Sequence, residues 1–506
     1  MTYTVHHLVG GKPVLDKTTQ RLDVHDPARG ACIGHVHVAN QSLCDQTVQL
    51  ASAACGPWSK TTATKRAQVL FAFREVLERH QAELARVVTL EHGKTLEDAR
   101  GSIARGIEVV EFYCGLLGQS QGLFSANVAT SIDCLTIRQP LGVCAGVSPF
   151  TFPVMVPLWM MIPALACGNA FILKPSEQTP SAANRLVEWL SDAGLPPGVA
   201  SCLHGDKTTV EHLLVHPGIA AFTAVASTPV AEAIYLKATQ QGKRAHTFGG
   251  AKNHCVVMPD ADLHDAARAI VGASFGSAGE RCMAISVVVA VGDDVADRLL
   301  SALRPLIQAI RVDAGDVPGC DMGPLISAAH RERVLQAVDD GVTAGARLVI
   351  DGRGFKHALY PDGYFMGPCL FDHVTEAMPI YQQEVFGPVL VLLRVANFEE
   401  ALALVNRNAY GNGTAIFTQQ GYYAREYTQR VQVGMVGVNI PIPVPVASHP
   451  FGGWKRSSFG GRNMQGMESV HFYTRLKTIT SKWTLGHDQG EGFAMPAHRD
   501  LPTTTG

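Results

Sequence analysis

The chain has 506 residues, more than one hydrophobic core usually organises, and 46% of them are hydrophobic. With 17% charged residues and a net charge of −2 at pH 7, the composition excludes a disordered chain and gives no electrostatic footprint for nucleic acid. Two or three folded domains are expected.

Residues 1–7 lack a basic segment followed by an apolar one, so no signal peptide is expected. Apolar runs such as 153–172 are interrupted by Pro, Gly and Asn, which is typical of a buried core rather than a membrane span. The 12 cysteines contain no C-x-x-C pair, so we expect no metal site and no disulfide framework. A reducing, cytoplasmic location is predicted.

The first part of the chain passes from short strands to helices. Turn signals within residues 8–39 predict strands, and from residue 42 to about 117 the apolar spacing is helical. Gly93 is expected to stop one helix there. The next helix, 95–117, carries Arg105, which the sequence alone describes as an ordinary solvated helix charge.

Strands and helices then alternate. Buried runs at 141–147, 170–174, 200–203 and 219–225 predict strands, and helical patterns follow each of them. This rhythm predicts an open parallel sheet with helices on both faces, whose ligands bind beyond the carboxyl ends of the strands.

No G-x-G-x-x-G motif follows any of these strands, so the usual dinucleotide fingerprint is missing. Ser227, Thr228 and Pro229 predict a helix start that could face a phosphate, although most capped helices bind nothing. Lys174 and Glu177 follow a strand end, where they could hold ribose hydroxyls or form an ordinary surface ion pair.

A second α/β unit begins at residue 251 and contains Cys282 between a glycine-containing loop and the apolar run 285–290. A cysteine at such a junction can be reactive, and Arg281 is expected to favour its thiolate. The alternative is an inert buried cysteine, the usual state of this residue.

Near the end of the chain, residues 471–480 predict a late strand. With 131–138 it is expected to form a projecting, hairpin-like arm for association of subunits. The polar segment 486–506 is predicted to be a loose tail.

Six motifs in order resemble the aldehyde dehydrogenase superfamily, from about residue 8 to about residue 484. They are Pro149-Phe150-Thr151-Phe152-Pro153, Lys174-Pro175-Ser176-Glu177, Phe248-Gly249-Gly250-Ala251-Lys252-Asn253-His254, the Cys282 loop, Glu384-x-Phe386-Gly387-Pro388 and Pro450-Phe451-Gly452-Gly453. Gly279-Glu280-Arg281-Cys282-Met283-Ala284 and Phe451-Gly452-Gly453-Trp454-Lys455 are similar to the CoA-acylating methylmalonate-semialdehyde dehydrogenase branch.

The resemblance implies an α/β fold with two open α/β domains and a small β arm. A Rossmann-like NAD-binding domain would span 1–125 and 143–250, and a catalytic domain 251–450. The oligomerisation arm would span 126–142 and 466–485. Homodimers that pair into tetramers are implied, with NAD as cofactor, CoA as co-substrate and a small aldehyde as substrate.

The resemblance also implies a role for each candidate residue. Cys282 would be the nucleophile, with its backbone N–H and Thr151 holding the oxyanion. The cofactor-binding residues would be Phe150, Lys174, Glu177, Ser227, Glu384 and Phe386. Arg105 and Arg281 would bind the substrate carboxylate.

Three positions depart from the superfamily pattern. Thr247 stands where hydrolytic members place a water-activating glutamate, which favours transfer of the acyl group to CoA. Thr151 replaces the usual asparagine, and Ala226 replaces glycine before Ser227. These changes leave alternatives open: an enzyme for another acidic aldehyde, a hydrolytic dehydrogenase, or a binding protein of low activity that keeps the fold.

Overall fold

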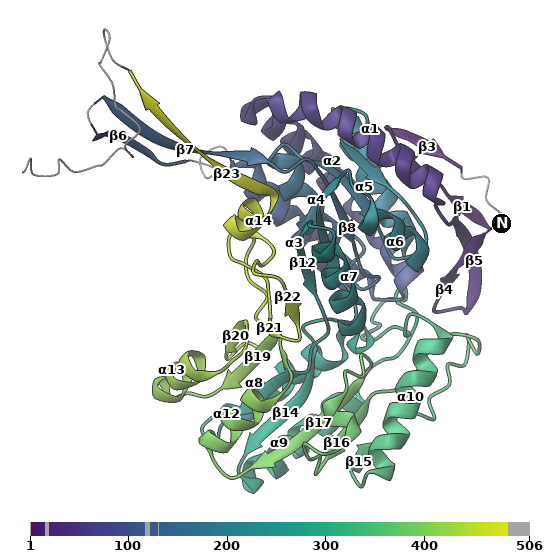
Figure 1. The fold of residues 1–506 in the computed structure, drawn as a ribbon. Coiled ribbons are helices and arrows are strands. Elements are labelled where there is room, and N and C mark those ends of the chain that lie inside the picture. The colour runs from purple at the N-terminus through teal and green to yellow at the C-terminus, as the bar shows by residue number, and fades with distance from the viewer. Residues whose placement is uncertain (1, 16–19, 117–121, 130, 484–506) are drawn as a thin grey trace, which may run out of the picture.

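The computed structural model describes residues 2–15, 20–116, 122–129 and 131–483; the expected tail at 486–506 lies outside them. The described chain forms two large sheets covered by helices and a three-stranded arm that projects from one side (Figure 1). The predicted α/β fold class is confirmed. Within the described ranges, no helix is both long enough and apolar enough to span a bilayer.

The first sheet has eight strands, of which the central five are parallel. In spatial order they are β22 (Ser458–Phe459), β12 (Arg244–Phe248), β11 (Ile219–Val225), β8 (Val143–Val147), β9 (Ala170–Lys174), β10 (Ala200–Cys202), β2 (His7–Val9) and β3 (Lys12–Val14). β12 is absent from the sequence prediction because its residues, Arg-Ala-His-Thr-Phe, lack the apolar run of the other strands.

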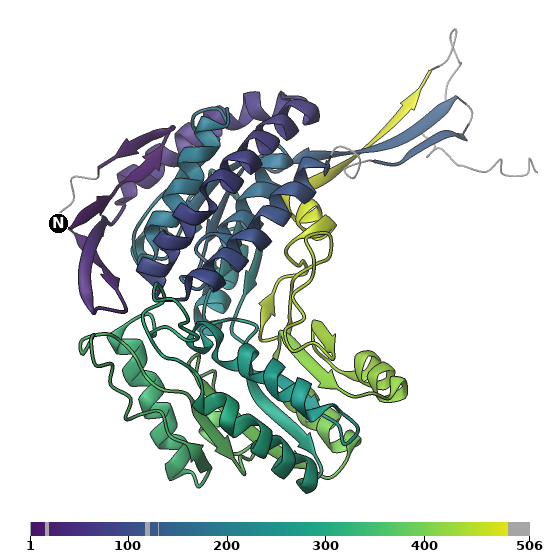
Figure 2. The ribbon, with the colours of Figure 1, turned by 180° about the vertical axis from the view of Figure 1, so that it is seen from behind.

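Helices cover both faces of this sheet. They are α1 (Gln41–Lys60), α2 (Ala63–His92), α3 (Leu96–Cys114), α4 (Met155–Ala166), α5 (Pro180–Asp192), α6 (Lys207–Val215) and α7 (Thr228–Gln240). On one face, Phe171 and Leu173 of β9 pack against helices α2 to α5. On the other face, the alternate residues Ala170 and Ile172 pack against α1, α6 and α7. Figure 2 shows α2 and α3, coloured violet to blue, side by side on the face of the sheet that they cover.

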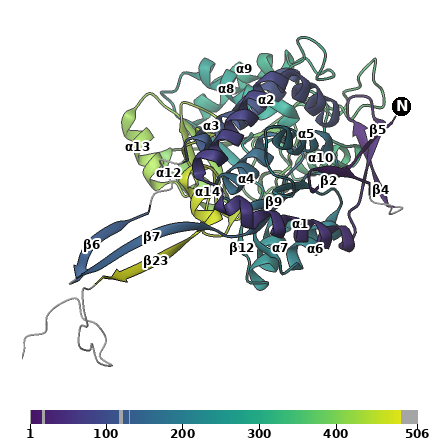
Figure 3. The same ribbon diagram turned by 90° about the horizontal axis from the view of Figure 1, so that it is seen from above.

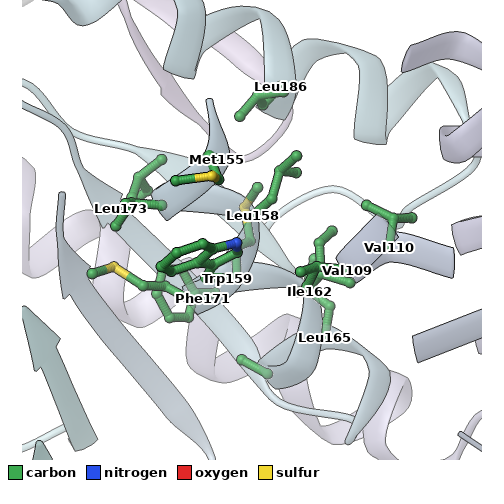
Figure 4. Close-up of a cluster of buried hydrophobic side chains, with 14 of the residues drawn as sticks. Val109, Val110, Met155, Leu158, Trp159, Ile162, Leu165, Phe171, Leu173 and Leu186 are labelled. Carbon is green, nitrogen blue, oxygen red and sulfur yellow. The ribbon is translucent and has the colours of Figure 1, made fainter. Parts of the chain in front are cut away.

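Helix α4 is buried on every side, which its almost entirely apolar sequence explains. It lies between β9 and the helices α2 and α3. Trp159, Leu158 and Ile162 of α4 point into a cluster with Phe171 and Val109 (Figure 4). This packing holds the segment that follows β8, which includes Thr151.

The second sheet has seven strands, all parallel except its edge strand β15. They are β15 (Arg347–Ile350), β16 (Cys369–Asp372), β17 (Val389–Val395), β14 (Ile285–Val291), β13 (Asn253–Val257), β19 (Gly413–Phe417) and β20 (Met435–Val438). The covering helices are α8 (Leu263–Phe275), α9 (Asp293–Gln308), α10 (Ala328–Thr343), α11 (Pro379–Gln382), α12 (Phe398–Arg407) and α13 (Gly421–Arg430). β18 (Tyr410–Gly411) and β21 (Trp454–Lys455) form a separate two-stranded pair.

The arm consists of β6 (Phe124–Ala129), β7 (Ile132–Pro140) and β23 (Thr474–Lys482), with β7 in the centre (Figure 3). The predicted pairing of its two main segments is confirmed, and β23 runs antiparallel to β7. The prediction of strand at residues 471–473 is wrong. These residues end helix α14 (Gly466–Tyr473), because Phe472 and Tyr473 are buried in the first core.

A third small sheet lies at the N-terminal edge, in the order β1 (Tyr3–Val5), β5 (Ala31–His37) and β4 (Arg21–Asp26). β4 and β5 form an antiparallel hairpin whose register shifts between Val24 and His25. Val5, Val24 and Val36 make its small core.

The first and second sheets are joined at Gly249 and Gly250, between β12 and β13. Helix α8 then leads through the short 3-10 helix η2 (Gly276–Gly279) to Cys282 and β14. The candidate site residues therefore lie where the two sheets meet (Figure 1).

Candidate active site

The turn before Cys282 is a strained, tightly packed segment. Ser277, Ala278 and Gly279 have φ values of 54°, 51° and 72°. Positive φ is uncommon for non-glycine residues and persists only where the surroundings impose it. A Cβ at Gly279 would lie 2.2 Å from the carbonyl oxygen of Gly387, so only glycine fits. The turn therefore fixes the approach of the chain to Cys282.

Two side-chain amides hold the backbone of Cys282. Asn253 Nδ2 and Asn412 Nδ2 each donate to the Cys282 carbonyl at 2.9 Å, and Asn253 also donates to Ala284 at 2.9 Å. Sequence reasoning missed both roles. Asn253 lay within a recognised motif, but nothing in the sequence connects position 412 with position 282.

The Cys282 thiol lies in a pocket with Glu384, Arg281 and Phe386. Burial raises the pKa of this thiol to about 12, and the charge of Glu384 acts in the same direction. Arg281, which was expected to favour the thiolate, is paired with Asp98 instead. The nearby cation that does lower this pKa is Lys94.

Arg281 is bound by helix α3. Its Nη2 donates to Asp98 Oδ1 at 2.7 Å, and both side chains are about four-fifths buried. Asp98 Oδ2 lies 3.7 Å from Lys94 Nζ. Although burial opposes it, Lys94 and Arg281 hold the pKa of Asp98 below its usual value, so Asp98 is ionised at neutral pH.

Arg105 lies seven residues after Asp98 on α3, on the same face of that helix. Its Nη2 donates to the carbonyls of Val444 and Pro445 at 3.0 and 3.3 Å, and its Nη1 to Glu108 at 2.8 Å. Arg105 is therefore not a simple solvated helix charge. It fastens the loop that contains Val444 and Pro445 to α3.

Thr151 is buried, and its carbonyl accepts a hydrogen bond from Lys94 Nζ at 2.7 Å. Lys94 also lies 4.3 Å from the centroid of the Phe152 ring, and burial lowers its pKa to about 8. Lys94 thus fixes the backbone of Thr151. In the part of the chain that the structure describes, no hydrogen bond joins the Thr151 hydroxyl to Cys282.

The structure brings Glu384, Phe386 and Phe150 together. Glu384 Oε1 accepts from Ala251 N at 2.8 Å, and burial raises its pKa to about 7. A Cβ at Gly250 would lie 2.1 Å from Glu384 Oε2, so glycine makes room for this carboxyl group. The Phe386 ring meets Phe150 edge-on, with centroids 6.1 Å apart.

Lys174, Glu177 and Ser227 lie at the carboxyl edge of the first sheet. Lys174 Nζ is 2.8 Å from Glu177 Oε2, directly after β9. Ser227 is the exposed N-cap residue of α7, and its side chain makes no cap hydrogen bond. Only β8 lies between β9 and β11. The ends of β9 and β11 are therefore two strand spacings apart, roughly 10 Å.

Thr247 is completely buried, and its hydroxyl donates to the Ala231 carbonyl of α7 at 2.8 Å. The next residue, Phe248, belongs to the core against which Cys282 packs. Position 247 therefore contributes a fixed neutral group that faces α7.

Glu280 is a further buried acid that sequence reasoning missed. Its Oε1 accepts from Ile326 N at 3.1 Å and lies 3.4 Å from His330 Nε2. Burial raises its pKa well above the usual range. His330 Nε2 also contacts the Phe386 carbonyl at 2.7 Å, so this pair braces both the Cys282 and the Phe386 segments.

Comparison with known proteins gives one consistent result. The model of the aldehyde dehydrogenase family matches residues 14–479. The chain is 49% identical to the malonate-semialdehyde dehydrogenase of Pseudomonas aeruginosa, covering 98% of this chain and 99% of that protein. It is 43% identical to the human mitochondrial acylating methylmalonate-semialdehyde/malonate-semialdehyde dehydrogenase, covering 95% and 89%.

Solved structures agree. A putative methylmalonate-semialdehyde dehydrogenase from Sinorhizobium meliloti, complexed with NAD, superposes with a TM-score of 0.95 at 48% identity, over 96% of this chain and 99% of that one. The methylmalonate-semialdehyde dehydrogenase of Oceanimonas doudoroffii gives a TM-score of 0.95 at 46% identity, with the same coverage.

Proposed function

The chain belongs to the aldehyde dehydrogenase family, and within it we propose that the protein oxidises malonate or methylmalonate semialdehyde with NAD and CoA, giving acetyl-CoA or propanoyl-CoA and CO₂. The names of relatives more than 40% identical over nearly the whole chain support the substrate class. The observation that favours CoA over water as acyl acceptor is the fixed, neutral side chain of Thr247.

The carboxyl edge of the first sheet fits a dinucleotide. The Lys174–Glu177 pair offers a cation and a carboxylate for ribose hydroxyls, and Ser227 leaves its hydroxyl and the first N–H groups of α7 free for phosphate. Glu384 and Phe386 would hold the nicotinamide end next to Cys282, and Phe150 packs against Phe386. When bound, NAD supplies the acceptor for the hydride that leaves the substrate.

Cys282 would carry the substrate as a covalent adduct. The thiol loses its proton to solvent, the thiolate attacks the aldehyde carbon, and the oxyanion that forms needs donors that are already in place. The Cys282 N–H is fixed because two amides hold its carbonyl, and Thr151 is fixed through Lys94. Loss of hydride from the adduct leaves a thioester on Cys282.

The thioester then needs an acceptor. Hydrolysis needs a base for water, and Thr247 cannot act as one at neutral pH. The thiol of CoA ionises far more readily than water and needs less help. A carboxylate in the β position to the thioester carbonyl can leave as CO₂, because that carbonyl accepts the electron pair.

The substrate carboxylate would be recognised by Arg281, with Arg105 as the second predicted cation. Arg281 directly precedes Cys282 and lines the same pocket. A guanidinium offers several N–H donors, so Arg281 can keep its bond to Asp98 and still bind a second carboxylate.

We assign the first sheet with its helices to NAD binding, the second to catalysis and the arm to association into dimers or tetramers. A cytoplasmic location is supported by the twelve cysteines, all of which lie in the described residues and are free.

A single-turnover experiment tests the covalent step. The protein is mixed with NAD and malonate semialdehyde without CoA, and the Cys282 peptide is weighed by mass spectrometry. We expect an acyl group on Cys282, which CoA then removes as acyl-CoA, and no NADH from Cys282→Ala. Rapid release of free acid without CoA would contradict the proposal.

A further inference from the structure

The outer face of the β4–β5 hairpin gathers four potential metal ligands. Asp23 lies directly opposite His35, and His25 lies directly opposite Cys32, with the Val24–Gly34 pair between them. Cys32 and His35 are three residues apart and would face opposite sides of a regular strand. The register shift between Val24 and His25 leaves Ile33 as an extra residue on β5, and this bulge turns Cys32 to the same face as His35.

The two faces of the hairpin differ in chemistry. Val24, Val36 and Ile33 pack inward with Val5 in a small apolar core. The opposite face carries the ligand-bearing side chains, with Asp23 and Cys32 exposed and His35 half-buried. A metal ion can therefore reach them from solvent. β4 and β5 lie at the periphery of the molecule, on the side opposite the arm (Figure 1).

The ligand atoms are already close. One carboxylate oxygen of Asp23, Cys32 Sγ and one ring nitrogen of His35 lie within 4.8 Å of one another. Within the described residues, the side chains of Asp23 and His35 make no hydrogen bond or ion pair. Cys32 Sγ makes one weak contact, donating to the Gly34 carbonyl at 3.4 Å. The lone pairs that a metal needs are therefore free.

We propose that this face is a binding site for a divalent transition-metal ion, zinc in the first instance. Thiolate, imidazole and carboxylate are the donor types that zinc takes in tetrahedral sites. Asp23, Cys32 and His35 supply three donors. His25 supplies the fourth after a side-chain rotation, because directly opposite residues have Cβ atoms roughly 5 Å apart.

Binding has two physical consequences. The Cys32 thiol must lose its proton to solvent as the metal–sulfur bond forms, so affinity increases with pH. The ion also ties β4 to β5 through side chains of both strands, which stabilises the hairpin only when the metal is present. We expected no metal site because the sequence has no C-x-x-C pair, whereas these ligands are assembled from two strands.

Cobalt(II) titration of the full-length protein tests the site. The experiment uses a Cys282→Ser background, so that the active-site thiol does not contribute. We expect one Co²⁺ per chain, the intense visible absorption of a tetrahedral site, a near-ultraviolet thiolate-to-cobalt band, and displacement of both by Zn²⁺. Cys32→Ser should abolish the thiolate band, and His35→Gln should weaken Zn²⁺ binding by about tenfold or more.

Cys134→Ser is the matched control, since Cys134 is another partly exposed cysteine next to an aspartate, on the arm. It should bind Co²⁺ like the background protein, and circular dichroism should show every variant folded. A missing thiolate band in the background protein, or a band that survives Cys32→Ser, would overturn the proposal. The test is independent of the dehydrogenase activity.

Discussion

Arg281 Nη2 donates to Asp98 Oδ1 at 2.7 Å, which links the residue before Cys282 to the first turns of helix α3. Asp98 in turn lies 3.7 Å from Lys94, whose ammonium group holds the Thr151 carbonyl. The predicted carboxylate-binding residue and the predicted oxyanion residue are thus positioned by one connected set of charges.

Asp98→Asn should selectively impair the use of carboxylated aldehydes. The variant removes the negative charge that orients Arg281, and hydrogen bonds to charged groups are worth about 1.5–3 kcal/mol. We expect KM for malonate semialdehyde to rise about tenfold or more, while kcat/KM for propanal changes little. Steady-state NADH formation with both aldehydes measures the difference.

Glu97→Gln is the control for this experiment, because Glu97 is an exposed neighbour on the same helix turn. It should leave both substrates unaffected. Arg281→Leu should reproduce the selective loss more strongly, and Arg105→Leu should do so if Arg105 also contacts the substrate carboxylate. Equal losses with both aldehydes would contradict the carboxylate role.

Thr151→Asn should raise kcat. An amide reaches further than a hydroxyl and offers a better placed donor, and an oxyanion donor in a protease contributes ~10²–10³ in kcat. Because Lys94, just before α3, fixes the backbone carbonyl of residue 151, the new amide starts from a fixed backbone position. Stopped-flow NADH formation measures the effect, with the melting temperature as a control for packing. An unchanged or lower kcat would show that the pocket is shaped around threonine.

Glu384→Gln should make Cys282 more reactive. The charge of Glu384 helps to raise the pKa of the thiol, so its removal lowers that pKa and increases the thiolate fraction. The pKa of Glu384 is itself about 7. The gain in alkylation rate should therefore be largest above pH 7 and shrink below it. Iodoacetamide labelling with peptide mapping measures this, with exposed Cys32 as the internal control. Equal rates at all pH values would refute it.

Glu91→Gln should flatten the dependence of stability on pH. Burial raises the pKa of Glu91 to about 7 in the folded protein, against 4.5 as its ordinary value. As pH rises between these values, the unfolded chain loses the proton while the folded chain keeps it, so folding is progressively disfavoured. The loss amounts to about 3 kcal/mol above pH 7.

Urea unfolding between pH 4 and pH 8 measures this contribution. The variant should lose less stability across that window than the parent protein. Its single amide oxygen can keep one of the two hydrogen bonds that Glu91 accepts, from the Tyr3 hydroxyl at 2.6 Å or from the Ser181 N–H at 3.1 Å. Exposed Glu97→Gln serves again as the control, and parallel pH profiles for parent and Glu91→Gln would contradict the assignment.

Much of the fold could be predicted from the sequence because its signals are local. Continuous apolar runs marked the central strands, and Gly93, with a φ of 93°, ends α2 as expected. β12 and β6 gave no such signal. His246 of β12 is buried and stacks on Phe472, which is distant in sequence, with ring centroids 3.6 Å apart. β6 is largely exposed.

The candidate site shows the same limit. Motifs identified Cys282, Glu384 and Phe386, which the fold brings into one pocket. The partners that set their chemistry could not be predicted, because they come from remote segments. Asp98 forms an ion pair with Arg281, and Asn412 donates a hydrogen bond to the Cys282 carbonyl. The direction of the Cys282 pKa shift follows from burial, which adjacent residues do not reveal.

The most direct test is NADH formation from malonate semialdehyde with and without CoA, with the products identified by mass. We predict turnover that depends on CoA and yields acetyl-CoA and CO₂. Sustained NADH formation without CoA, with a free acid as product, would contradict the account, because water would then be the acceptor despite Thr247.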